Sequence, residues 1–371
     1  MNLKPYILIA VIVLIIGAIY FIGFGNIKRT ESDQAVLVTP RVSSLEQKSK
    51  RYELAKEITT PDGFINTNGK PVAIGDFIGK KVILVDFWTY SCINCQRTTP
   101  YLNSWYEKYK DKGFVIVGIH TPEFEFEKDY NNVKAAVEKF SIKYPVVLDN
   151  DFSTWTAYRN HFWPRKYLID IDGYIVYDHI GEGAYEKTEK EIQQALAERM
   201  QVLGESGNIN QSVTKETPVA SGINSPETYF GADRNEFFRN GKSGTVGSQN
   251  GLTVPFYINA NTLYLSGDWN ITNEFAQNNS VNAGILYKYT AKDVFLVSQA
   301  DSETEVEVLL DGKAFSKGIG ADVIKTSDGK TIFKVKEARL YKIIQGSQSE
   351  THILELKIQE PGLKAFTFTF G

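Results

Sequence analysis

The sequence is poor in cysteine, histidine and methionine, which contribute 2, 4 and 2 of its 371 residues. Two cysteines exclude the disulfide-rich scaffold of a small secreted protein. Lysine and arginine total 41 against 44 aspartates and glutamates, a net charge of −3. The basic excess typical of nucleic-acid binders is therefore absent, and we expect no nucleic-acid partner. The histidines are scattered without ligand spacing, so we also expect no metal site.

An apolar run near the start predicts a membrane anchor. Residues Tyr6–Phe24 carry no charge and are bracketed by Lys4 and Lys28. A helix of this length would span a bilayer core. We predict a transmembrane anchor over residues 6–27 and a polar stalk over residues 28–57. A long cleaved signal peptide is the alternative, and the flanking charges do not support an N-in orientation.

The rest of the chain predicts two domains joined by a linker. Residues 58–203 alternate strand-like and helix-like segments, which indicates a layered α/β domain. Residues 204–224 are rich in glycine, serine, asparagine and threonine, as in linkers. Residues 225–371 contain short alternating runs with turn signals, which predicts an antiparallel sandwich or jelly roll.

Both cysteines lie in one Cys-x-x-Cys motif, Cys92 and Cys95, between the apolar run Lys81–Trp88 and a helical pattern. Cysteines three apart at a helix start can reach disulfide geometry. Cys92 would sit at the helix N-terminus, where free N–H groups and the helix dipole favour a thiolate. Cys95 would resolve the mixed disulfide. Zinc needs four ligands, and no second cysteine pair exists. We expect no cofactor beyond the redox-active Cys92–Cys95 disulfide.

Two further residues fit this chemistry. Asp86 stands in the apolar run six residues before Cys92, where burial would raise its pKa and let it accept the proton of Cys95. A solvent-facing strand-end aspartate is the alternative. Pro164 precedes a predicted strand and suits a cis bond beside the cysteines, with the adjoining backbone free to bind a substrate peptide.

Residues 58–200 resemble the thioredoxin-like redoxins of the TlpA type, and in particular the extracytoplasmic thioredoxin domain of the DipZ family. The similar segments are Val85–Thr98, His120–Phe124, Trp163–Asp170 and Gly181–Tyr185. The tail also resembles that family, at Pro226–Tyr229, Leu265–Trp269, Leu310–Gly312, Arg339–Tyr341 and Ala365–Phe368. The resemblance therefore covers about residues 58–371.

The resemblance implies that Cys92 is the nucleophile, Cys95 the resolving cysteine, and Asp86 and Pro164 the thioredoxin acid and cis-proline. We expect Trp88 and Trp163, which flank these positions, to contact substrate. The family's multi-spanning electron-delivery module is replaced here by one hydrophobic helix. The chain would therefore need a separate membrane electron donor, such as a CcdA-like protein. The implied location is the cell membrane, with a single pass and the bulk of the chain outside the cytoplasm.

In the family the last domain is a jelly roll similar to carbohydrate-binding modules. Exposed aromatic rings on such a domain can stack on sugars. The candidates for glycan binding are Trp269 and Tyr264, with Tyr257 and Tyr287 as further candidates. Packing of these rings in the core is the alternative, and the alternation of residues does not decide between the two.

The function predicted is a membrane-anchored thiol:disulfide oxidoreductase that reduces or exchanges disulfides of envelope proteins. One alternative is a thiol peroxidase. Arg97 lies near the cysteines, but the proline of a Pro-x-x-x-Thr-x-x-Cys context is missing. Another alternative is a glycan- or envelope-binding protein with a minor redox role.

Overall fold

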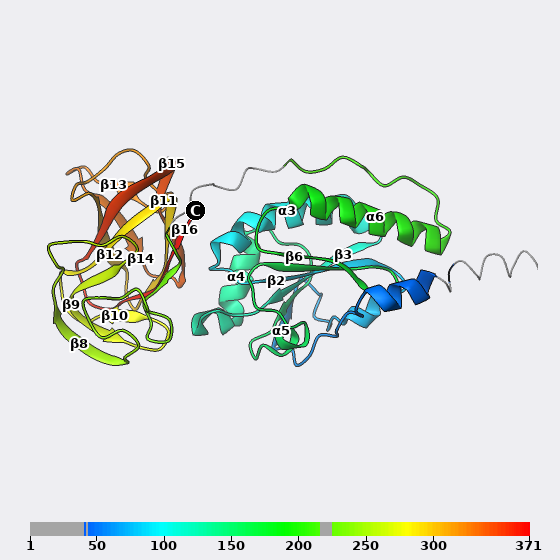
Figure 1. The fold of residues 1–371 in the computed structure, drawn as a ribbon, viewed down its shortest axis with the longest axis horizontal. Coiled ribbons are helices and arrows are strands. Elements are labelled where there is room, and N and C mark those ends of the chain that lie inside the picture. Colours follow the sequence, from blue (N-terminus) through cyan, green and yellow to red (C-terminus); the bar gives the residue numbers. More distant parts are fainter. Residues whose placement is uncertain (1–40, 42–43, 216–224) are drawn as a thin grey trace, which may run out of the picture.

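The computed structural model describes residue 41, residues 44–215 and residues 225–371. The predicted anchor, residues 6–27, lies outside the described residues. Within the part of the chain that is described, no helix is long and apolar enough to cross a membrane. Figure 1 shows an α/β domain and a β domain lying side by side.

The α/β domain is built on a six-stranded sheet with the strand order β1-β4-β3-β2-β5-β6. β2 pairs in parallel with β3, and β3 with β4, while the remaining pairings are antiparallel. The strands are β1 (Gly63–Ile65), β2 (Val82–Trp88), β3 (Phe114–His120), β4 (Val146–Leu148), β5 (Arg165–Ile169) and β6 (Ile175–Ile180). β2 and β3 are buried along their whole length, as the apolar runs predict for strands covered on both faces.

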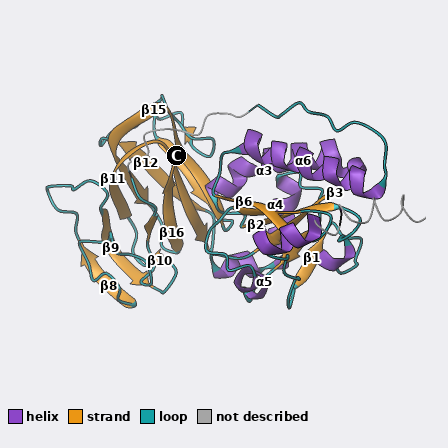
Figure 2. Cartoon of the chain, turned by 45° about the vertical axis from the view of Figure 1, so that its right-hand side comes forward, coloured by secondary structure: helices purple, strands orange, loops and turns teal. Residues whose placement is uncertain are grey.

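Helices cover both faces of this sheet, as Figure 2 shows. They are α3 (Ile93–Tyr109), α4 (Tyr130–Lys139), α5 (Ser153–Ala157) and α6 (Tyr185–Leu203). The period of two along β2 sends Leu84 and Trp88 into the core shared with α3, α4 and α6. Val85 and Phe87 face the core on the α5 side. Asp86 therefore shares the α3 side of the sheet with Leu84 and Trp88.

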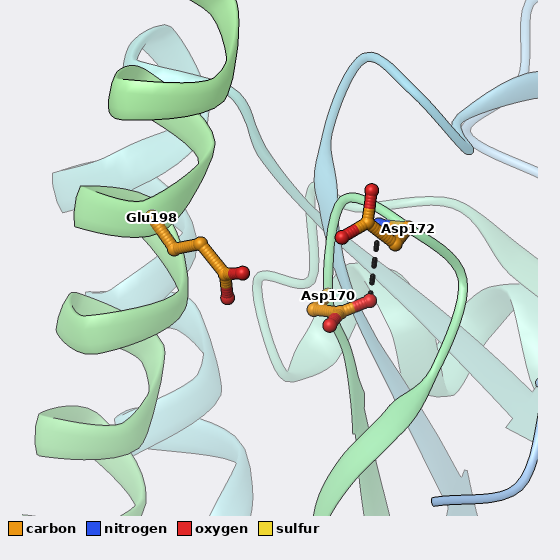
Figure 3. Close-up of side chains that lie close together, drawn as sticks. All are labelled: Asp170, Asp172 and Glu198. Atoms are coloured by element: carbon orange, nitrogen blue, oxygen red, sulfur yellow. Dashed lines mark hydrogen bonds between the residues drawn. The ribbon is translucent and has the colours of Figure 1, made fainter. Parts of the chain in front are cut away.

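The predicted stalk does not stand apart from the α/β domain over its C-terminal half. Residues 44–51 are helical, and Lys48 inserts its ammonium among three carboxylates of the domain. Its Nζ lies 2.6 Å from Asp170, 2.9 Å from Asp172 and 2.5 Å from Glu198. Figure 3 shows these carboxylates converging, with the Asp172 amide donating to Asp170. They could otherwise suggest a cation site, but the Lys48 ammonium already lies among them, and Arg41 pairs with Asp172 at 2.8 Å.

The domain boundary predicted at residue 58 is therefore too late, and the segment before it belongs to the domain. Ala55 N–H donates to Gly173 O at 2.9 Å, and Ile175 N–H donates to Glu53 O at 2.9 Å. These backbone bonds extend the edge of the sheet beside β6. Polar composition alone could not reveal them, because the contacts are made by main-chain atoms and by one long lysine.

The predicted linker is also ordered by contacts over residues 204–215. Ile209 is buried in the core beneath α3 and α6. Thr214 N–H donates to Glu189 at 2.6 Å, and Lys108 pairs with the same carboxylate at 2.7 Å. This stretch runs back along α6 toward the β domain (Figure 1).

The β domain is an antiparallel sheet that folds back on itself around one hydrophobic core. β11 pairs with β15, β16 and β9, and β16 reaches β9 through β10, so the hydrogen-bonded network closes. A register shift between Ala291 and Asp293 bends β11. The strands are β7 (Thr228–Tyr229), β8 (Gly247–Leu252), β9 (Leu263–Ile271), β10 (Ala276–Asn278), β11 (Ala283–Ala300), β12 (Thr304–Leu310), β13 (Ile324–Lys325), β14 (Thr331–Val335), β15 (Arg339–Ile358) and β16 (Leu363–Phe370).

Candidate active site

The Cys-x-x-Cys motif lies where strand β2 passes into helix α3. Cys92 is the N-cap of α3, with extended backbone angles, and its Sγ accepts from the Cys95 N–H at 3.3 Å. Both cysteines are free thiols, Cys92 partly exposed and Cys95 2% exposed. Burial raises the pKa of Cys95 well above its usual range, and the neighbouring Cys92 and Asp86 add to the effect. The exposed N-cap sulfur can meet a client, while the buried one needs a base before it can attack.

Asp86 of β2 supplies a carboxylate on the side of the sheet that α3 covers, close enough for its charge to raise the pKa of Cys95. It is 1% exposed, as the apolar neighbours predict, and its Oδ1 has no hydrogen-bond partner among the described residues. Burial raises the pKa of Asp86 to about 7, an effect that Lys166 opposes. A carboxyl with a pKa near neutrality can exchange a proton with the Cys95 thiol at physiological pH.

Lys166 is a functional residue that the sequence analysis missed. It is the cross-strand partner of Asp86 on β5 and is fully buried. Burial lowers the pKa of Lys166, and Asp86 acts in the opposite direction. Its Nζ donates to Gly181 O at 3.1 Å. Lys166 stands two residues before Leu168 on the same strand, so both side chains lie on the α3 side of the sheet. This spacing is the pattern that could have placed Lys166 beside Asp86.

Pro164 follows a cis peptide bond after Trp163, the conformation that the sequence predicts. The carbonyl of Pro164 accepts from Gly181 N–H at 2.8 Å, and Trp163 Nε1 donates to Thr121 O at 3.0 Å. Trp163 is partly exposed and can still meet a substrate. The neighbouring Phe162, 47% exposed, offers a further apolar contact that the sequence analysis did not single out.

Trp88 does not fit its predicted role in substrate contact. It is 3% exposed and packs edge-on against His120, with ring centroids 5.0 Å apart. Its position at the end of β2, on the α3 side, points it into the core. Trp88 therefore shapes the site from below without touching a client.

Glu127 fixes the loop that presents Cys92. Its fully buried carboxylate accepts from Ser91 N–H at 3.1 Å and from Ser91 Oγ at 2.6 Å. The other carboxylate oxygen accepts from the amides of Glu123 and Phe124, at 2.6 and 3.1 Å. Burial raises the pKa of Glu127, while the Ser91 hydrogen bond opposes the rise. No sequence pattern points to this residue, because it lies in a charged stretch typical of a protein surface.

The β domain packs directly on the redox motif. Ile93, between the two cysteines, is 3% exposed and belongs to an apolar cluster that spans the two domains. Phe366 of β16 contacts Phe124 and Phe126, with ring centroids 5.1 and 4.8 Å apart. The remaining members of this interdomain cluster are Phe295, Val297, Leu340, Tyr229 and Phe275.

Polar contacts flank this cluster. Glu123 accepts from Tyr229 and from Arg234, each at 2.8 Å. Arg97 of α3 lies 3.4 Å from Glu182 and 3.5 Å from Asp293. A thiol peroxidase would need an arginine to support its peroxidatic thiolate, but the Arg97 guanidinium already contacts the carboxylates of Glu182 and Asp293.

Comparisons with known proteins agree with this geometry. Residues 53–196 match the family model described as Redoxin, and residues 225–371 match the model described as Thioredoxin like C-terminal domain. Thiol-disulfide oxidoreductase ResA of Bacillus cereus is 32% identical over 145 residues, which is 38% of this chain and 79% of that protein. The chain belongs to the redoxin family.

Protein DipZ of Mycobacterium tuberculosis is 34% identical over 319 residues, covering 84% of this chain. The chain spans less than half of that relative, 43% of its length. Both domains of the redoxin described here thus have counterparts in one protein, and the match supports the DipZ/TlpA-like assignment.

The predicted sugar-stacking aromatics of the β domain are mostly core residues. Trp269 and Tyr264 are 0% and 3% exposed, and Tyr287 is also buried. Trp269 on β9 and Tyr287 on β11 belong to the domain core. Tyr264 lies on the opposite face of β9, where it is also buried and its OH accepts from Asn259 N–H at 3.3 Å. None of these three rings can therefore stack on a glycan. Of the four candidates only Tyr257 is exposed, beside Phe256 in the segment between β8 and β9.

Proposed function

We propose that this redoxin is a membrane-anchored, extracytoplasmic thiol:disulfide oxidoreductase acting on envelope proteins. The observation that carries the proposal is the arrangement of three groups: Cys92 at the N-cap of α3, Cys95 buried one turn later, and buried Asp86, whose charge raises the pKa of Cys95.

In the proposed reaction the Cys92 thiolate attacks one sulfur of a client disulfide. The Cys92–client disulfide forms, and the other client sulfur leaves as a thiolate. Asp86 then takes the proton of Cys95, and the Cys95 thiolate attacks Cys92 Sγ. The second client sulfur leaves, the client has gained two electrons, and the Cys92–Cys95 disulfide remains.

A new catalytic cycle needs two electrons from outside. We propose that a membrane dithiol protein of the CcdA type supplies them by exchange with the Cys92–Cys95 disulfide. The apolar run of residues 6–27 would hold the domain beside such a donor. A carbohydrate-binding-module-like jelly roll remains our proposal for the β domain, although the burial of Trp269 and Tyr264 removes two predicted sugar contacts.

The function is tested by turnover of a disulfide-bonded client peptide with the full-length chain in detergent micelles and dithiothreitol as electron source. Wild type should turn over, and Cys92→Ser should abolish turnover. A reduction potential near thioredoxin's, about −270 mV, would mark a reductant. Full activity in Cys92→Ser would overturn the proposal. A potential near −120 mV would reverse the direction and make the domain an oxidant.

A further inference from the structure

A groove runs along the seam between the two domains, beside the redox loop. It encloses about 560 Å³, a size typical of ligand sites. Its floor is apolar and comes from both domains: Tyr90, Ala135, Ala136, Phe140, Ala300 and Leu340.

The groove shares a wall with the redox site. Tyr90 stands two residues before Cys92, and Gln96 directly follows Cys95. Gln96 Nε2 donates to Tyr90 O at 2.8 Å, and Tyr90 OH donates to Ala338 O of the β domain at 3.2 Å. A chain bound here would therefore run past the loop that presents the nucleophile. A second hollow of about 300 Å³ also borders Gln96 and Phe140 and extends along the seam.

Charged side chains of both signs line the rim of the groove. Lys139, Lys336 and Arg339 line it, together with the carboxylates of Asp301 and Glu337. Asp301 is paired with Lys364 at 2.8 Å, and Arg339 is paired with Asp322 at 2.9 Å. These pairs leave Lys139 and Lys336 beside the single carboxylate of Glu337. Lys139 forms no salt bridge with any described residue. Burial and, to a smaller degree, Arg339 lower its pKa, while Asp322 and Glu337 oppose this effect. A carboxylate brought into the groove would give the Lys139 ammonium the partner that it lacks among the described residues.

We propose that the groove binds an extended segment of the client polypeptide, apolar and carrying an acidic side chain, next to the client's own cysteine. This inference rests on the proposed function and names its substrate class. The apolar floor would bind the side chains of the segment, and Lys139 its carboxylate. The β domain would then be half of the client site rather than a separate binding module.

Two substitutions on the exposed face of α4 test the groove. Ala135 lines it, whereas the adjacent Lys134 is exposed and does not. The client is a short apolar peptide disulfide with one glutamate on each arm, and hydroxyethyl disulfide serves as a small substrate. Ala135→Trp should lower kcat/KM for the peptide about tenfold, about 1.4 kcal/mol, by raising KM. Lys134→Trp should change nothing, and hydroxyethyl disulfide turnover should be equal in all three proteins.

Charge reversal tests the acidic preference. Wild type should favour the glutamate peptide over the same peptide with lysine, and Lys139→Glu should reverse the order. Equal kcat/KM of Ala135→Trp and wild type on the glutamate peptide would overturn the groove as the client site while leaving the redox function intact. Turnover of neither disulfide by wild type would instead overturn the proposed function, and the groove's role with it.

Discussion

Asp86 on β2 and Lys166 on β5 are cross-strand partners, and both side chains are fully buried on the face of the sheet that α3 covers. The lysine opposes the rise that burial causes in the pKa of Asp86, which settles at about 7. In the proposed mechanism, the pair would set the proton affinity of the base for the resolving step, and Lys166 comes from the strand that follows Pro164.

Asp86 should make the protein less stable as the pH rises. Its pKa is about 7 in the folded chain and about 4 in an unfolded chain. The folded state therefore binds more protons between these values, and the free energy of unfolding falls as pH rises from about 4 to 7. Asp86→Asn removes this slope. The difference in free energy of unfolding between Asp86→Asn and wild type should therefore shift by about 4 kcal/mol in favour of the variant from pH 4 to pH 8. This figure comes from a pKa difference of roughly three units at about 1.4 kcal/mol per unit. Urea unfolding across this range measures the gain, and parallel curves would contradict it.

Asp86→Asn should also slow the resolving step selectively. General-base catalysis contributes about 10²–10⁴-fold to proton transfer steps, so we expect roughly 100-fold slower attack by Cys95 at pH 7.5. Quenched-flow with mass spectrometry should show the Cys92–client disulfide accumulating. The first attack, by Cys92, should keep its rate. A variant that resolves as fast as wild type would exclude Asp86 as the base.

Lys166→Met should move the pH profile of the same step. Without the ammonium the pKa of Asp86 rises further, so the base form appears at higher pH. We expect the midpoint of the resolving rate to shift upward by about one pH unit. Lys134→Met, on the exposed face of α4, is the control and should leave the midpoint unchanged. An unshifted midpoint in Lys166→Met would mean that the lysine has only a packing role.

Ile93→Ala should be costly although the residue stands between two redox cysteines. Its side chain is buried against the β domain, so truncation should cost about 2–4 kcal/mol in free energy of unfolding. Asn94→Ala, at the neighbouring and partly exposed position, should stay within about 0.5 kcal/mol. Denaturant unfolding of both variants checks the difference. A negligible cost for Ile93→Ala would contradict the interdomain packing.

Much of this site could be predicted because it follows from local patterns. The strand before Cys92, the helix start after it, the burial of Asp86 and the cis bond at Pro164 are all set by residues close in sequence. Lys166 and Glu127 were missed because their roles depend on which strand and loop become their neighbours.

The same reason explains the errors at the domain boundaries and in the β domain. Lys48 belongs to the α/β domain through carboxylates more than 120 residues away. Trp269 and Tyr257 are both aromatic residues in a strand-rich region, yet one is fully buried and the other 81% exposed. Trp269 lies on β9, where alternation shows that two faces exist but only the closed sheet shows which is inside, whereas Tyr257 lies outside the strands, between β8 and β9.

The central claim is that Cys92 attacks the client and Cys95 resolves the mixed disulfide. The most direct test is to determine which cysteine becomes attached to a client. A peptide activated as a mixed disulfide is reacted with full-length Cys95→Ser and Cys92→Ser chains in detergent micelles, and the adducts are located by intact and peptide mass spectrometry. The account predicts a stable adduct on Cys92 in Cys95→Ser, little reaction of buried Cys95 in Cys92→Ser, and in wild type only the Cys92–Cys95 disulfide with free peptide. Faster adduct formation on Cys95 than on Cys92, or a persistent adduct in wild type, would contradict it.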